Sequence, residues 1–144
     1  MPNVIQFDTG VKEYTLNDAV SVKMNPTDLS FVERIFATFD AMDAKQEAYN
    51  AAIQEEKDAA GVFRIARAMD EEMRAMIDGA FGTAVCEPLF GSVSVYALSD
   101  GLPLWANLML ALIDEMDVAF AREKKAANPR IKKYMAKYES RKSK

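Results

Sequence analysis

The stretch LWANLMLALIDEMDVAF, residues 104–120, decides the fold of this chain. Its apolar side chains recur every three or four residues, the spacing of an amphipathic helix. The stripe consists of Leu104, Trp105, Leu108, Met109, Leu112, Ile113, Met116 and Phe120. Leu110 and Val118 lie off this stripe, so the helix is apolar over much of its circumference. We therefore expect it to be the core helix, central to the fold or shared with a partner.

Two further helical patterns precede it. Thr27 is a candidate N-cap for a helix over residues 29–53, with a break predicted at residues 40–43. A second apolar stripe covers residues 62–77. Its charged face, from Asp70 to Arg74, is expected in water, and Gly79 and Gly82 are expected to end the helix.

The first 24 residues predict β structure. Residues 4–7 form a short strand candidate, and residues 8–10, Asp-Thr-Gly, have turn chemistry. Residues 14–24 alternate between apolar and polar side chains, which favours a half-buried strand with a tight turn at Asn17 and Asp18.

Together these patterns predict a mainly α fold of the α+β class. A short N-terminal β-hairpin, or two to three short strands, is followed by a bundle of four to five helices. We expect a single domain over residues 1–127, with strands in 1–24 and a helical body over 28–127. Asn128 and Pro129 mark the start of a basic helical extension over 128–144 with a disordered end.

Charge is divided unevenly along the chain. Residues 122–144 carry ten basic and two acidic groups, a net of +8, whereas residues 1–121 carry eight basic and twenty acidic groups, a net of −12. This asymmetry favours contact with other protein surfaces, including further copies of the chain. For the basic tail, protein contact or a simple solubilising role is favoured over nucleic-acid binding, because the acidic body would repel nucleic acid.

Composition narrows the chemistry. The sequence has no histidine and one cysteine, Cys86, which excludes zinc sites and Ser-His or Cys-His nucleophile pairs. We expect no catalytic, cofactor-binding or metal-binding residue, and Cys86 as a small buried hydrophobe. The remaining catalytic material is acidic, in clusters at residues 55–58 and 114–117. A helical Mg²⁺-dependent nucleotide pyrophosphohydrolase could use such carboxylates, but a solvated helix face is the favoured interpretation.

Targeting signals are not evident. The N-terminal residues lack a basic region followed by a long apolar run, and residues 102–112 are too short an apolar stretch to span a bilayer. We expect a cytoplasmic protein that does not insert into membranes.

Several stretches resemble a known family. They are VSVKMNPTDLSFVERIF (residues 20–36), FDAMD (39–43), QEAY (46–49), FG (90–91) and DGLPLWANLM (100–109). With the β-type start and the Lys- and Tyr-rich end, they resemble the tail assembly chaperones encoded in the tail-gene region of siphophages and of prophages of Gram-positive bacteria. The resemblance implies a non-enzymatic protein that coats the long tape measure protein before the tail tube polymerises.

A holdase for a helical client needs an adaptable apolar groove and complementary charge. The residues expected to bind the tape measure or tail tube protein, alongside self-association, are Met69, Met73, Met76, Trp105, Met109, Lys132, Lys133 and Lys137. Packing in the core is the favoured alternative for most of these methionines and for Trp105. An alternative within the same class is a minor structural tail or connector protein. Aromatic residues such as Phe90, Tyr96 and Phe120 are expected in the core rather than around a ligand.

Overall fold

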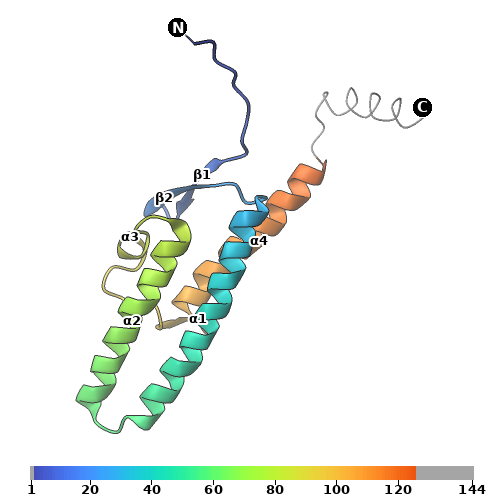
Figure 1. The fold of residues 1–144 in the computed structure, drawn as a ribbon. Coiled ribbons are helices and arrows are strands. Elements are labelled where there is room, and N and C mark those ends of the chain that lie inside the picture. Colours follow the sequence, from blue (N-terminus) through green and yellow to red (C-terminus); the bar gives the residue numbers. More distant parts are fainter. Residues whose placement is uncertain (1, 126–144) are drawn as a thin grey trace.

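The computed structural model describes residues 2–125 as a β-hairpin followed by a helical body (Figure 1). The elements are β1 (Lys12–Leu16), β2 (Val20–Met24), α1 (Leu29–Glu55), α2 (Ala59–Phe81), α3 (Cys86–Phe90), β3 (Leu98–Ser99), β4 (Leu102–Pro103) and α4 (Leu104–Lys125). The mainly α, α+β prediction is confirmed. The expected boundary at residue 127, the basic extension and its end lie outside the described residues.

Three long helices make up the body. α1 and α2 run antiparallel beside each other, and α4 crosses behind α1 in the direction opposite to it (Figure 1). The hairpin lies at the end of the body where α1 begins and α2 ends (Figure 1). In the described residues, no helix is both long enough and apolar enough to span a bilayer.

The hairpin follows the predicted strand and turn. β1 and β2 are antiparallel, with Leu16 opposite Val20. Asn17 and Asp18 have positive φ values of 51° and 54°, and the Ala19 N–H donates to the Leu16 carbonyl at 2.9 Å. Asn and Asp tolerate this left-handed conformation, which tight hairpin turns require. The tight turn predicted at Asn17 and Asp18 is confirmed.

The strand predicted at residues 4–7 is wrong. Val4, Ile5 and Phe7 are 76%, 90% and 77% exposed, in an extended segment that pairs with no described strand. A short apolar stretch forms a strand only where the edge of another strand is available for pairing, and residues 4–7 do not pair with the hairpin.

α1 begins and continues differently from the prediction. Asp28, not Thr27, is the N-cap, because its carboxylate accepts the Ser30 N–H at 3.0 Å. The break predicted at residues 40–43 does not occur. Met42 is fully buried and Asp43 is exposed, so the segment continues the amphipathic pattern and contains no helix-breaking residue.

α2 ends at Gly82, as predicted, whose φ of 72° gives the left-handed C-cap. Gly79, also predicted as a helix end, lies inside α2 instead. A glycine costs a helix interior only about 1 kcal/mol, which packing of the neighbouring turns offsets.

The core lies between the three long helices, the hairpin and the segment that holds α3. α4 is confirmed as a core helix, with six buried positions. The apolar cluster of buried residues consists of Val22, Met24, Phe31, Ile35, Met42, Met73, Ile77, Ala80, Val85, Cys86, Val95, Tyr96, Trp105, Ala106, Met109, Leu112 and Met116.

Candidate interaction surface

Three of the predicted partner-binding residues are core residues. Met73 and Met109 are fully buried and Trp105 is 2% exposed. Their side chains are therefore not available to a partner in this conformation, and a groove built from them would require the helices to separate. This corrects the expectation of an apolar groove at these positions and agrees with the alternative that they pack in the core. The period of the stripe was right, but period alone does not distinguish a core from a binding face.

Aromatic contacts hold Trp105 in place. Its indole Nε1–H donates to Gln46 Oε1 at 2.7 Å, and its ring meets Phe39 edge-on at 5.7 Å. Nearby, the Tyr49 and Tyr96 rings stack 3.9 Å apart. These pairs join α4 and the segment before it to α1. The expectation that Tyr96 is a core residue is confirmed; Phe90 and Phe120 are half-buried.

Met69 and Met76 on α2 are half-buried and pack against the core. Met76 also lines an open groove between α1 and α2, which we call the α1/α2 groove. The groove is shallow and largely open to solvent, has a volume of about 380 Å³ and is lined by Arg34, Ala37, Thr38, Ala41, Met76, Gly79 and Ala80. Four of these seven side chains are Ala or Gly, so two helix backbones are reachable from outside.

Space above Gly79 is open. A Cβ placed on Gly79 would meet nothing within 4 Å, so the groove could take a larger side chain at that position without a clash. Lys132, Lys133 and Lys137, the other predicted partner-binding residues, lie outside the described residues.

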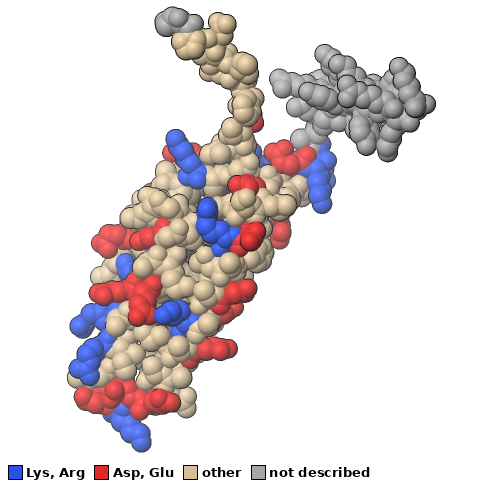
Figure 2. Space-filling model, viewed as in Figure 1, with Lys and Arg blue, Asp and Glu red and all other residues tan. Residues whose placement is uncertain are grey.

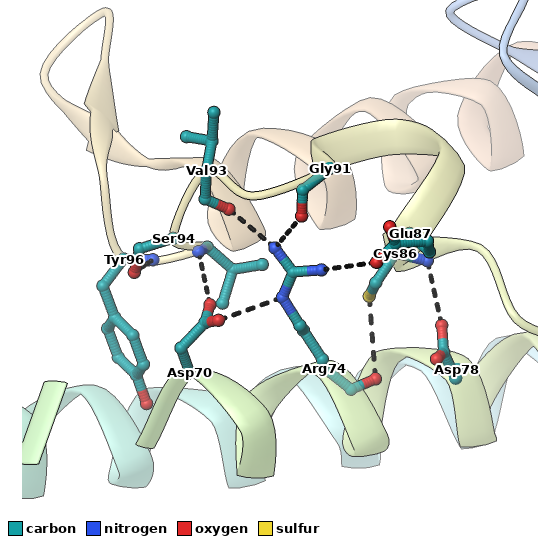
Figure 3. A network of polar contacts seen from close by, with 10 residues as sticks. Asp70, Arg74, Asp78, Cys86, Glu87, Gly91, Val93, Ser94 and Tyr96 are labelled. Atoms are coloured by element: carbon teal, nitrogen blue, oxygen red, sulfur yellow. Dashed lines mark hydrogen bonds and ion pairs between the residues drawn. The ribbon is translucent and has the colours of Figure 1, made fainter. Parts of the chain in front are cut away.

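A polar network fastens the segment around α3 to α2 (Figure 3). Arg74 is its centre: Nε donates to Asp70 Oδ2 at 3.0 Å, and Nη2 donates to the Gly91 and Val93 carbonyls at 2.8 and 2.7 Å. A longer ion pair of 3.8 Å joins Nη1 to Glu87, whose side chain is 84% exposed. The guanidinium thus bridges a helix and a loop.

Two carboxylates on the same face complete the network (Figure 3). Asp70 Oδ1 accepts the Val95 N–H at 2.8 Å, and Asp78 Oδ1 accepts the N–H groups of Val85 and Cys86 at 2.9 and 3.0 Å. Arg74 and the two carboxylates bond to one another, to Glu87 or to the backbone of residues 85–95. These hydrogen bonds hold residues 85–95 against α2 and leave few groups free for a ligand. We call this network of Asp70, Arg74, Asp78 and their partners the clasp.

The sequence interpretation placed Asp70 and Arg74 in water, which is wrong. Their side chains are only 17% and 16% exposed. The sequence did indicate that these residues could form a network, because Asp70, Arg74 and Asp78 are spaced four residues apart and so share one helix face. Spacing could not reveal that the segment at residues 85–96, which includes α3, covers that face.

Cys86 lies inside this clasp and is 1% exposed. Its thiol is 3.6 Å from the Arg74 carbonyl. Burial raises the pKa of the Cys86 thiol from 9.0 to about 12, and the neighbouring Asp78 carboxylate adds to the rise. The expected small buried hydrophobe is confirmed.

The Cys86 thiol should react slowly in the folded protein. At pH 8 we expect alkylation by iodoacetamide to be at least about 100-fold slower than in urea, because the thiolate is the reacting form. Since the folded pKa lies above the ordinary value, the bound proton stabilises the fold fully below about pH 9, and this contribution is lost as pH rises towards about 12. Equal alkylation rates with and without urea would contradict this placement.

The acidic clusters considered for metal-dependent hydrolysis lie apart. Glu55 ends α1 at the far end of the body, whereas Asp114 and Asp117 lie on α4 (Figure 1). Within residues 2–125, no three Asp, Glu, Cys or His side chains gather as ligands for a metal ion. Glu115, in the second cluster, accepts a hydrogen bond from the Tyr14 hydroxyl at 3.1 Å.

Searches against family models, curated proteins and solved structures found no match to the chain.

Proposed function

We propose that this protein is a tail assembly chaperone of a phage or prophage, which binds the tape measure protein during tail assembly in the bacterial cytoplasm. It acts by binding and self-association rather than by catalysis. The stretches at residues 20–49 and 100–109 that resemble this family support the proposal. The structural observation that carries it is the α1/α2 groove.

The groove suits a helical client. Ala37, Ala41 and Gly79 project little from their helices, so an added helix could approach both backbones closely. Met76 supplies a flexible apolar contact that adapts to different client side chains. Arg34 gives one basic group at the groove for an acidic client residue. A helix laid in an apolar groove is a common mode of peptide recognition.

Gly79 offers a matched pair of variants. Gly79→Phe should fill the groove and weaken binding of a tape measure fragment at least about tenfold, whereas Gly79→Ala should leave binding within about twofold. Gly79→Ala should also raise the free energy of unfolding by about 0.5–1 kcal/mol, because glycine inside a helix costs backbone entropy.

Isothermal titration of the fragment into each variant, with urea unfolding alongside, measures both effects. If Gly79→Phe folds normally and binds the fragment as wild type does, the client does not occupy this groove. If wild type does not bind the fragment at all, the chaperone assignment fails.

A further inference from the structure

The N-terminal segment projects from the body as an arm, which we define as residues 2–11 (Figures 1 and 2). Three of its large apolar side chains, Val4, Ile5 and Phe7, are each more than three-quarters exposed, and Val11 is 51% exposed. Asp8 is its only charged side chain, so the arm is almost entirely uncharged. Large apolar side chains exposed together on a projecting segment mark a contact surface.

The root of the arm is built to direct it outward. Asp8 Oδ1 accepts the Gly10 N–H at 2.8 Å, and Asn25 Nδ2 donates to the Thr9 carbonyl at 2.9 Å. Gly10 has a φ of 76°, and a Cβ there would lie 2.5 Å from Asn25 Nδ2, so glycine is strongly favoured at this position. Asn25 is itself fixed, because its Oδ1 accepts both the N–H and the hydroxyl of Thr27 at 2.9 Å. The arm therefore leaves the body instead of folding back along β1.

An apolar, uncharged hollow lies elsewhere on the same chain. It encloses about 420 Å³ between the end of β1, α3 and the first turns of α4, and we call it the β1/α4 hollow. Its apolar lining consists of Leu16, Leu89, Phe90, Leu104, Leu108 and Ala111. Thr15 and Asn107 add polar groups that could pair with an extended backbone, and none of the lining residues is charged. The volume falls within the roughly 300–1,000 Å³ typical of binding pockets.

We propose that the arm of one copy docks in the β1/α4 hollow of a second copy. The arm is apolar with a single charged residue, and the hollow is apolar with none, so the two surfaces are chemically complementary. The hollow lies at the turn end of the hairpin, whereas the arm leaves from the opposite end and away from the body. An arm that projects in this direction can enter the hollow of another molecule but not that of its own chain. If two copies exchange arms, they form a closed dimer. If each arm docks on a different copy, a longer assembly forms. This inference does not depend on which client the protein binds.

Self-association of the full chain tests the arm. Wild type should associate in a concentration-dependent way in sedimentation velocity, and Phe7→Asp should weaken association at least about tenfold. Ala111→Arg, on the exposed side of the hollow, should do the same. Phe63→Asp is the matched control, because Phe63 is 66% exposed on α2, remote from arm and hollow. Wild type that stays monomeric at every concentration, or variants that all associate as wild type does, would overturn the proposal.

Disulfide trapping tests the geometry. A Phe7→Cys chain mixed with a differently tagged Ala111→Cys chain should form a heterodimer under mild oxidation, whereas Phe63→Cys mixed with Ala111→Cys should not. The native Cys86 is buried and should not compete. A chain that carries both Phe7→Cys and Ala111→Cys tests the alternative location of the arm. If it closes the bond within itself at all dilutions, the arm docks on its own body and the proposal is wrong.

Discussion

Replacing Arg74 with Met should lower the free energy of unfolding by about 3 kcal/mol, the largest effect expected from any one polar side chain described here. Arg74 donates to Asp70 and to two backbone carbonyls from a position that is only 16% exposed. Without the guanidinium, a carboxylate and two carbonyl groups would stay largely buried with fewer partners.

The exposed ion pair between Lys45 and Glu72 provides the control. Their side chains are 43% and 57% exposed, so Lys45→Met should change stability by less than about 0.5 kcal/mol. Urea unfolding followed by circular dichroism measures both variants. An Arg74→Met protein as stable as Lys45→Met would show that the clasp does not hold residues 85–96 against α2.

Replacing Trp105 with Ala should cost about 3–5 kcal/mol, because it leaves a large cavity in the core and removes the hydrogen bond to Gln46. Phe63→Ala, at an exposed position on α2, should stay within about 0.5 kcal/mol. The same unfolding measurement distinguishes the two roles considered for Trp105. A Trp105→Ala protein that keeps its stability and loses only partner binding would show that Trp105 is a partner-binding residue and not a core residue.

The sequence predicted the parts of the fold that local chemistry determines. The hairpin turn followed from Asn17 and Asp18, two residues that tolerate positive φ. α4 followed from its helical apolar period, and Cys86 was correctly expected in the core. In each case, the neighbouring residues in the chain carried the information.

Some errors were local, at the N-cap of α1, at the break predicted at residues 40–43 and at Gly79. The errors that affect the interaction surface concern contacts between distant segments. Whether residues 4–7 pair as a strand depends on a partner edge, and whether Asp70 and Arg74 meet water depends on residues 85–96 folding over them. The core positions of Met73 and Met109 likewise depend on which helix faces meet. The α1/α2 groove was not predicted for the same reason, since Ala41 and Gly79 lie 38 residues apart in sequence.

The pyrophosphohydrolase alternative predicts an enzymatic activity that the chaperone proposal does not. If clustered carboxylates acted on nucleotides, Mg²⁺-dependent pyrophosphate release would be measurable and would be lost on Glu55→Ala or Asp114→Ala. We expect no such release, because an assembly factor needs only its binding surfaces. Release that depends on either carboxylate would replace the chaperone proposal with an enzymatic one.

Photo-crosslinking from Ala41 tests the central claim, that the protein works by holding a helical partner in the α1/α2 groove. Benzoylphenylalanine replaces Ala41 in the groove, or Phe63 on the opposite face of α2 as the control, and each protein is irradiated with a tape measure fragment. We predict a crosslink to the fragment from position 41 and not from position 63. Crosslinking from position 63 alone, or equally from both, would contradict the claim.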